Sequence, residues 1–316
     1  MKDMYLGIDT SNYTTSLALL DESGALIANL KAPLPVKGGE VGLRQSDAVF
    51  AHIKNFPGLF SEIKPYLLDG VLRAVGVSLR PRNVDGSYMP VFTVGDMLAK
   101  GISTFCDAAL YEFSHQCGHI MSAIYSSGAL KLLCGDKFAS FHISGGTTEL
   151  VRTNFVKGKG FDCELVGGTM DLNAGQIIDR VGVFMGLGFP CGVEIEKLAL
   201  KNTKQIPKKK ISASGTSVNL SGLENMAKKL YSDTKDAALT SAFVLDYISR
   251  ALIAMSDAYI EKYGDTDFVF AGGVMSNTII KEALEARFKS HFAKPELSRD
   301  NAVGIAYLTY LTYNNK

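Results

Sequence analysis

The chain has 316 residues, of which 47% are hydrophobic and 21% are charged, and its formal net charge is +1. This length predicts two domains with substantial cores, and the near-neutral charge restricts any RNA-binding surface to a local basic patch. We expect no membrane-spanning segment and no membrane partner, because no apolar run approaches the ~20 residues that a span needs.

Cysteine usage and the first residues predict the compartment. The five cysteines are an odd number, widely spaced and without Cys-x-x-Cys, which fits a reducing environment better than a disulfide framework. No signal peptide is evident, since residues 1–5 lead straight into a predicted strand. We therefore expect a cytoplasmic protein.

The first predicted element is a β-meander over residues 4–31, in which Asp21–Gly24 forms the second turn. Its first hairpin, Leu6–Leu19, consists of an apolar strand, a small polar turn and a second apolar strand. Asp9 lies near the end of the first strand and is the candidate catalytic residue.

A helix is predicted over residues 43–67, where apolar residues recur at helical spacing and Pro57 marks a boundary. A short buried strand follows at Ala74–Leu79. The polar segment Arg80–Tyr88 then leads into a helix from about Val91 to Phe105. Two arginines, an aspartate and a glycine in this segment are compatible with a substrate loop and equally with a solvated loop.

Two histidines begin the next predicted helix. His115 and His119 are four residues apart, so on a helix both imidazoles lie on one face, in a chelating geometry for a transition metal. The zinc-peptidase signature requires Glu directly after the first histidine, and this chain has Gln116 there. Spacing alone also leaves open that these are two ordinary histidines.

The central motif is a second hairpin, Phe141–Val151, whose turn contains Ser144, Gly145 and Gly146. Because glycine has no Cβ, we expect the backbone N–H groups of this turn to face an anionic ligand such as phosphate. His142 lies two residues before the turn and is expected to point into the same mouth. A plain hairpin is the alternative interpretation.

The two hairpins have similar sequences. Aligning Thr14-Thr15 with Thr147-Thr148 places Asp9 over His142, with apolar strands on both sides of each turn. Such repetition predicts two related lobes. The alternative is that hydrophobic hairpins simply resemble one another.

Gly167–Gly175 is predicted to be a turn that leads into a helix carrying Asp179, and the glycine-rich segment 186–192 ends that helix. The five lysines from Lys201 to Lys210 indicate either a solvated loop or a contact with RNA phosphates. Residues 234–263 are predicted to form a long core helix.

Asp267–Asn277 is predicted to be a buried strand, a Gly272-Gly273 turn and a helix start. Bare glycine backbone at such a turn suits the base and ribose of a nucleotide. Asp300 and Asn301 precede the last helix, and one of them is expected to cap it; metal ligation is the alternative interpretation of Asp300.

In this order, the motifs resemble those of the tRNA threonylcarbamoyladenosine transferase family, the TsaD-like proteins formerly described as O-sialoglycoprotein endopeptidases. The resemblance covers nearly the whole chain. The segments that match family motifs are His115–His119, Ser144–Thr148, Ala174–Asp179, Pro190–Gly192, Ser221–Leu223, Ala271–Asn277 and Asp300-Asn301.

The resemblance implies an α/β chain with the actin-like ATPase (ASKHA) fold, in which two ribonuclease-H-like lobes surround a nucleotide cleft. We expect the lobes at residues 1–113 and 114–316, with the last helix packing back on the first lobe. The implied ligand is an adenine nucleotide, either ATP or an AMP adduct, with magnesium as an accompanying ion. The implied partners are tRNA and a smaller paralogous subunit.

The resemblance also implies roles for individual residues. His115, His119 and Asp300 match the metal ligands of the family, and His142 stands where archaeal members have a tyrosine ligand. Three histidines and one aspartate suit iron or zinc better than magnesium. The residues implied in nucleotide or substrate binding are Ser144, Gly145, Gly146, Asp179, Gly192, Gly272, Gly273 and Asn277.

Four departures from the family pattern concern the reaction. The acidic pair of the first hairpin is replaced by Tyr13-Thr14, and the Gly-Pro-Gly-Leu loop by Arg80–Asn83. The histidine after Ser-Gly-Gly is Thr147, and the glutamate of the Ala-Gly-Glu helix is Gln176. The predicted ligand-holding residues survive, so the sequence supports nucleotide and metal binding more strongly than the reaction.

Three hypotheses follow. The first is a metal- and ATP-binding transferase that moves the threonylcarbamoyl group from threonylcarbamoyl-AMP to N6 of a tRNA adenosine. The second is a non-catalytic nucleotide-binding paralogue that acts as a partner subunit. The third is a metal-dependent hydrolase or carbamoyltransferase with a small-molecule acceptor. The lost acidic pair favours the second or third, whereas the complete metal set favours the first or third, and our prediction is the first.

Overall fold

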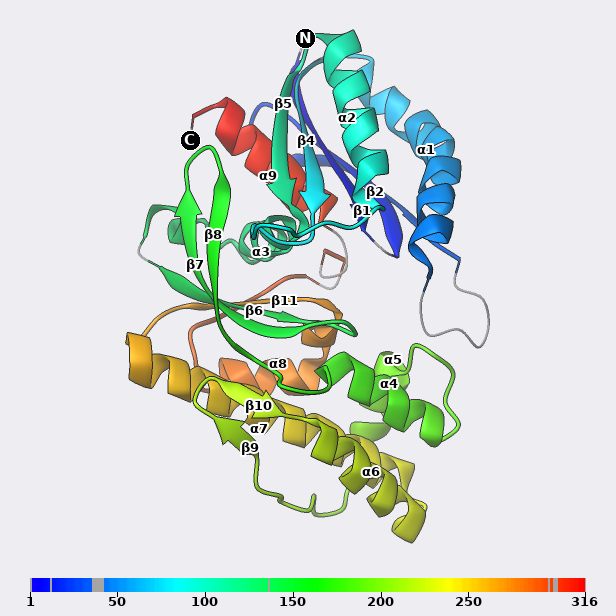
Figure 1. Cartoon of the computed structure of the whole chain (residues 1–316), viewed down its shortest axis with the longest axis vertical. Helices are drawn as coiled ribbons and strands as arrows, with labels where there is room; N and C mark the ends of the chain where they lie inside the picture. The colour runs from blue at the N-terminus through cyan, green and yellow to red at the C-terminus, as the bar shows by residue number, and fades with distance from the viewer. Residues whose placement is uncertain are drawn as a thin grey trace. The chain divides into compact units, whose positions relative to one another are not determined.

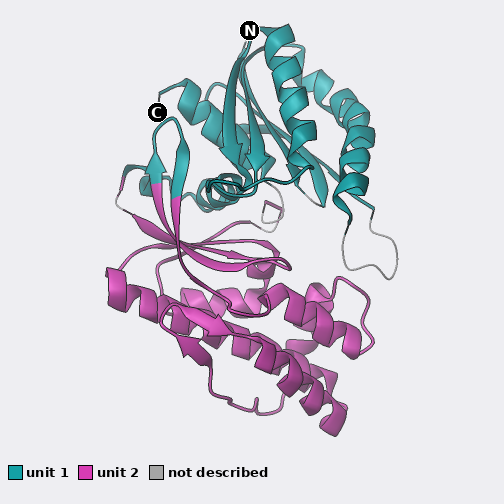
Figure 2. Ribbon diagram, viewed as in Figure 1, with its two compact units in different colours: residues 1–134, 155–162, 299–316 teal, residues 135–154, 163–298 magenta. Residues whose placement is uncertain are grey.

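The structure, a computed structural model, describes residues 2–11, 13–35, 43–135, 137–294, 296–297 and 301–315. Its internal contacts divide the chain into two compact units (Figure 2). Unit 1 comprises residues 1–134, 155–162 and 299–316, and unit 2 comprises residues 135–154 and 163–298. The lobe boundary between residues 113 and 114 stays a prediction.

Unit 1 contains a five-stranded sheet of order β3-β2-β1-β4-β5 (Figure 1). Its strands are β1 (Lys2–Ser11), β2 (Thr14–Leu20), β3 (Leu26–Pro33), β4 (Gly70–Arg80) and β5 (Ala109–Ser114). Its helices are α1 (Gln45–Leu67), α2 (Phe92–Cys106), α3 (His115–Ser127), the short η1 (Leu130–Cys134) and α9 (Ala302–Tyr313). The first three strands form the predicted antiparallel meander, and β4 and β5 extend the sheet in parallel.

Unit 2 contains a second five-stranded sheet, of order β12-β11-β6-β7-β8. Its strands are β6 (Phe138–Ile143), β7 (Thr148–Val156), β8 (Gly160–Gly168), β11 (Phe268–Ala271) and β12 (Ser290–Phe292), with β9 (Ser212–Ser214) and β10 (Ser217–Asn219) as a separate pair. Its helices are α4 (Ala174–Phe184), α5 (Gly192–Ala199), α6 (Ser221–Thr234), α7 (Ala237–Tyr263), the short η2 (Gly273–Ser276) and α8 (Thr278–Glu285). The tip of the β7–β8 hairpin belongs to unit 1.

The two sheets repeat one topology. Counted from the edge strands β3 and β8, the third strand of each sheet is the first strand of its hairpin, β1 or β6. Two parallel strands follow it, β4 and β5 in one sheet and β11 and β12 in the other. Asp9 pairs with Ser16 across β1 and β2, and His142 pairs with Glu149 across β6 and β7. The sequence alignment that superposes Asp9 on His142 therefore also superposes the registers of both hairpins, which confirms the predicted internal repeat.

Helix α9 packs tightly against β1 and β4. A Cβ atom at Gly7 would overlap the carbonyl oxygen of Ala302, and one at Gly76 would overlap the hydroxyl of Thr309. Glycine at these two strand positions therefore lets the helix backbone approach the sheet. The described residues of α9 from 302 to 311 are all buried.

Helix α1 continues through Pro57, contrary to the predicted boundary. Proline in a helix interior costs about 3 kcal/mol, partly because one carbonyl loses its N–H partner. Pro57 is exposed and Ile53, whose carbonyl is affected, is 51% exposed, so water is available to that carbonyl. The opposite face buries Phe56, Leu59 and Ile63, each worth about 1.5–3 kcal/mol, and this burial outweighs the cost of the proline.

One helix in the described part of the chain, α7, is long and apolar enough to cross a membrane. However, 72% of its most apolar window is buried against the rest of the protein. Phe243, Val244, Ile248 and Leu252 belong to the hydrophobic core of unit 2. The helix therefore serves as the core helix that its apolar spacing predicts.

Candidate functional site

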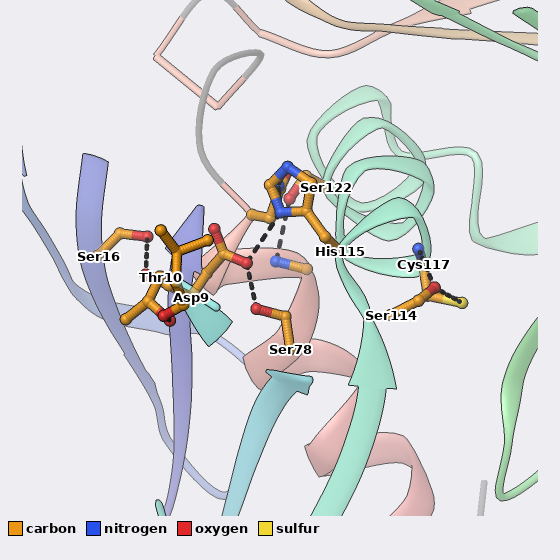
Figure 3. Close-up of polar contacts among 11 residues, drawn as sticks. Asp9, Thr10, Ser16, Ser78, Ser114, His115, Cys117 and Ser122 are labelled. Carbon is orange, nitrogen blue, oxygen red and sulfur yellow. Dashed lines mark hydrogen bonds and ion pairs between the residues drawn. The ribbon is translucent and has the colours of Figure 1, made fainter. Parts of the chain in front are cut away.

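Asp9 lies at the centre of a buried polar cluster in unit 1 (Figure 3). Its Oδ1 accepts a hydrogen bond from the hydroxyl of Ser78 and lies 2.9 Å from Nδ1 of His115. Parallel pairing of β1 with β4 places Asp9 beside Ser78, and His115 begins α3 directly after β5, the neighbour of β4. Two adjacent strands and the helix that follows a third thus supply one cluster.

The charge of Asp9 is stabilised by its neighbours. Burial alone would raise the pKa of this carboxyl, because the side chain is only 1% exposed. Attraction to His115, together with hydrogen bonds from His115, Ser78 and Ser11, outweighs burial and holds the pKa of Asp9 below its usual value. Asp9 is therefore a buried carboxylate that acts as a hydrogen-bond acceptor.

Asn301 contacts the same histidine from the start of α9. Its Nδ2 lies 2.5 Å from Nδ1 and 3.0 Å from Nε2 of His115. Within the described residues, the Asn301 side chain makes no cap of its own helix, because it is turned toward the histidine. Asp300, the predicted metal ligand or cap, lies outside the described residues.

The two predicted metal-binding histidines of α3 lie together. The ring centroids of His115 and His119 are 4.7 Å apart, with the rings nearly edge to face. Over the ranges that the structure describes, no group of three His, Cys, Asp or Glu side chains gathers to hold a metal ion. The predicted ligand His142 belongs to unit 2, so the four-ligand set stays a prediction.

Two buried polar residues of unit 1 escaped the sequence analysis. Ser78, which donates to Asp9, lies within β4, which the sequence marks only as a buried apolar strand. His52 is fully buried in α1, and its Nδ1 lies 2.8 Å from Oγ1 of Thr15. Burial lowers the pKa of His52, which favours its neutral form. The helical spacing of Ala48, His52 and Phe56 is the signal that could have placed it in the core.

In unit 2, the Ser-Gly-Gly turn satisfies part of its own hydrogen-bonding capacity. The N–H of Ser144 donates to the carbonyl of Thr147, at 2.8 Å. The hydroxyl of Ser144 accepts from the N–H groups of Gly146 and Thr147, at 3.2 Å each. The turn thus differs from the prediction that its N–H groups face outward, because the Ser144 side chain folds over them. His142 lies beside this network, with Nδ1 3.3 Å from Oγ1 of Thr147.

Two glycines allow other segments to reach this turn. The N–H of Gly175, at the start of α4, donates to the carbonyl of Ser144 at 3.2 Å, and a Cβ on Gly175 would lie 2.6 Å from that oxygen. Gly272 has φ +99°, and a Cβ there would overlap the carbonyl of Ile143. The structure therefore brings Gly272 and the start of α4 to the end of β6, beside Ser144.

The remaining predicted nucleotide residues hold backbone segments of unit 2. Asp179 accepts the N–H of Cys191 at 2.8 Å, which fixes the chain just before Gly192. Asn277 caps α8, its Oδ1 accepting from the N–H of Ile280 at 3.1 Å. Gly273 begins η2. Their contacts with a nucleotide stay predictions.

A pocket of about 380 Å³ opens beside the turn within unit 2. It lies in the size range of small-molecule sites, and both polar and apolar side chains line it. The lining residues are Gly146, Thr147, Thr148, Glu149, Leu165, Val166, Gly167, Gly168, Thr169, Asn173 and Ser217. Of the residues predicted to bind nucleotide, Gly146 alone is among these lining residues.

Asp171, which lies close to this pocket in the sequence, binds the N-terminus of α6. One oxygen accepts the N–H groups of Leu220 and Ser221, at 2.7 and 3.1 Å, and the other accepts the hydroxyl of Ser221 at 2.7 Å. Burial alone would raise the pKa of Asp171, but these hydrogen bonds outweigh it and lower the pKa. Asp171 thus caps a helix from a distant part of the chain.

Replacement of Asp171 by Ala should destabilise unit 2 by about 1 kcal/mol at neutral pH, the usual cost of losing a helix cap. Because the folded pKa is lowered, the stabilisation is complete above the unfolded pKa of about 3.9 and is lost as pH falls through the folded pKa. Urea unfolding at pH 7 and at pH 3 measures both effects. Asp171→Asn, which keeps one acceptor oxygen, should lose less, and a difference between wild type and Asp171→Ala that grows toward low pH would contradict this role.

The sequence has known relatives over nearly its whole length. It is 28% identical to tRNA N6-adenosine threonylcarbamoyltransferase of Neorickettsia sennetsu, covering 96% of this chain and 92% of the relative. It is 29% identical to the protein of that name from Streptococcus gordonii, covering 100% of this chain and 94% of the relative. The alignment with the Streptococcus gordonii protein thus includes the two hairpins and the last helix.

Structural comparison confirms the predicted fold class. Component A of the (R)-2-hydroxyglutaryl-CoA dehydratase of Acidaminococcus fermentans superposes with a TM-score of 0.57 at 14% identity, over 98% of this chain and 99% of the other. This likeness shows the two-lobed actin-like ATPase fold. The sequence model of TsaD, tRNA N6-adenosine threonylcarbamoyltransferase, matches residues 72–307. The chain therefore belongs to the tRNA N6-adenosine threonylcarbamoyltransferase family.

Proposed function

We propose that this chain transfers the threonylcarbamoyl group from threonylcarbamoyl-AMP to N6 of a tRNA adenosine. The observation that carries the proposal is the buried contact between Asp9 and His115 at the start of the His-x-x-x-His helix. It gives His115 a buried carboxylate as its hydrogen-bond partner, at the helix where the family resemblance predicts metal chemistry. The names of the relatives from Neorickettsia sennetsu and Streptococcus gordonii support the same reaction.

The donor set on α3 fits a transition metal. His115 and His119 present two imidazoles whose ring centroids are 4.7 Å apart, and imidazole suits iron or zinc rather than magnesium. Asp300 and His142 are the proposed further ligands. A metal ion bound here would supply Lewis-acid chemistry toward the carbonyl of the threonylcarbamoyl group.

We assign Asp9 a positioning role that it exerts through His115. Its carboxylate is buried and accepts the Nδ1–H of that ring, while Ser78 donates to the same oxygen. With the proton on Nδ1, Nε2 of His115 carries the lone pair. The Asn301 amide nitrogen contacts this Nε2 at 3.0 Å, and a metal ion would take its place. Asp9 thus orients a ligand without reaching the substrate.

The Ser-Gly-Gly turn of unit 2 is the proposed site for the anionic part of the adenylate. A Cβ added at Gly145 or Gly146 would meet no atom within 4 Å, so open space lies beside both residues. An anionic ligand group can replace the Ser144 hydroxyl as the acceptor of the Gly146 and Thr147 N–H groups. Rotation of one side chain is enough to expose these donors.

Complementation tests the proposed reaction. Expression of this chain in a strain depleted of its own essential transferase should restore growth and the modified nucleoside. Failure by a folded, metal-loaded protein would reject the transfer reaction and favour a non-catalytic nucleotide-binding paralogue. Growth without the modified nucleoside would reject it equally.

Replacement of His142 by Ala should weaken metal binding by at least about tenfold, because loss of an outer-shell partner alone typically costs about 10–100-fold. Chelator competition followed by metal analysis measures this. His291→Ala is the matched control, since His291 also lies in unit 2 but pairs with Asp267, at 2.7 Å. Unchanged metal affinity in His142→Ala would remove His142 from the ligand set.

A further inference from the structure

Residues 201–211, here called the lysine loop, form an exposed basic segment of unit 2. It contains five lysines, Lys201, Lys204, Lys208, Lys209 and Lys210, and no acidic residue, although the whole chain has a formal net charge of only +1. All five lysine side chains are exposed, and the segment has no regular secondary structure. A cationic segment of this kind on a nearly neutral chain concentrates positive potential in one place.

Contacts from α7 hold the backbone of the loop in place. Arg250 donates through Nη1 to the carbonyl of Lys209 at 2.7 Å, and Tyr247 donates to the carbonyl of Lys210 at 3.3 Å. Ile206 and Ile211 turn inward and pack against the hydrophobic core. The backbone is therefore held at Lys209 and Lys210, the flanking isoleucines pack inward, and the lysine side chains are exposed.

The local charges are incompletely neutralised. Lys204 pairs with Asp236 at 2.8 Å, and Lys208 shares Asp246 with Arg250. Within the described ranges, no ion pair involves Lys201, Lys209 or Lys210, and these three ammonium groups are open to an external anion. Asp236 and Asp246 pair with Lys204 and Lys208, and the other three lysines extend from a backbone that contacts with α7 hold in place.

We propose that the lysine loop binds the phosphate backbone of the tRNA substrate. The inference rests on the proposed function, which supplies an RNA of many regularly spaced negative charges. Lysine is suited to phosphate as a point charge, and both isoleucines of the loop pack against the core of unit 2. Phosphate contacts position a nucleic acid without reading its sequence, so the loop contributes affinity and orientation while base selection lies elsewhere.

The test replaces Lys201, Lys209 and Lys210 together by Glu in the full chain and measures binding of an unmodified tRNA transcript at several KCl concentrations. Each phosphate contact contributes about 0.7–0.9 to the slope of log affinity against log salt. The slope should therefore fall by about 2–3, and affinity near 0.1 M salt should fall at least about tenfold. For the transfer reaction, KM for tRNA should rise while kcat stays within about twofold.

The matched control replaces three exposed lysines elsewhere on unit 2, Lys229, Lys262 and Lys289, by Glu, which changes the net charge equally. It should bind tRNA with a slope close to that of wild type. A Lys→Gln triple at 201, 209 and 210 repeats the test if the charge-reversed protein melts early. Equal losses in both triples, or wild-type binding by the loop variants, would overturn the proposal.

Two further outcomes separate this proposal from the proposed function. If wild type modifies tRNA and the loop variants bind tRNA unchanged, the lysine loop is not the contact, and the reaction stands. If wild type neither binds nor modifies tRNA, both proposals fail. Loop-dependent binding of poly-glutamate without binding of tRNA would assign the loop to an acidic protein partner and overturn the RNA proposal.

Discussion

Asp9→Asn is expected to lower metal affinity and the rate of threonylcarbamoyl transfer, each by about 10–100-fold, the usual range for loss of an outer-shell carboxylate. The amide oxygen can still accept from Nδ1 of His115, but it carries no charge to hold that tautomer. Asp9 is buried and its carboxylate lies 2.9 Å from that nitrogen, so the effect has to pass through the histidine. Metal titration against a chelator and single-turnover transfer measure the two losses.

Asp3→Asn is the matched control for this change. Asp3 lies on the same strand, but its side chain is on the surface and pairs with Arg73 at 2.7 Å. It should alter neither metal affinity nor transfer. Retention of wild-type metal affinity in Asp9→Asn would contradict the positioning role, and a lost transfer rate with full metal binding would instead place Asp9 at the substrate.

Gly7→Ala is expected to destabilise unit 1 by about 3 kcal/mol, the upper end of the usual range for overpacking. A methyl group at this position overlaps the backbone of α9 at Ala302, and backbone atoms cannot move aside as a flexible side chain can. The helix has to leave the sheet, and it takes Asn301 away from His115. Thermal unfolding of the full chain, followed by hydrogen exchange of β1 and α9, measures the loss.

Gly101→Ala provides the comparison. Gly101 lies in α2, where an added Cβ would meet nothing within 4 Å, so alanine should be neutral or stabilise by up to about 1 kcal/mol. If Gly7→Ala melts with wild type, α9 does not pack on β1 as closely as described.

The repeated hairpins show what local sequence could predict. Apolar strands, small polar turns and the Thr-Thr pairs predict both the duplication and its alignment, because strand pairing across a tight turn depends on neighbours in sequence. The same reasoning placed α3, and with it His115 and His119, correctly. Long-range partners could not be read this way. Ser78 meets Asp9 only because β4 lies beside β1 in parallel.

Side-chain direction accounts for the other differences. Composition of the Ser-Gly-Gly turn predicted available N–H groups, but the Ser144 hydroxyl folds back onto two of them, a rotamer choice that sequence does not encode. Pro57 predicted a helix boundary, yet the helix continues because the proline lies on the exposed side. Asn301 occupies the N-cap position of α9, but its side chain contacts the His115 ring instead of the helix N-terminus.

The most direct test of transferase activity combines the purified, metal-loaded chain with synthetic threonylcarbamoyl-AMP and an unmodified tRNA transcript, followed by mass spectrometry of the digested nucleosides. We predict the appearance of N6-threonylcarbamoyladenosine at a rate that falls by about 10–100-fold in Asp9→Asn and is unchanged in Asp3→Asn. Absence of this nucleoside, from a folded protein shown to bind both metal and tRNA, would contradict the proposed reaction.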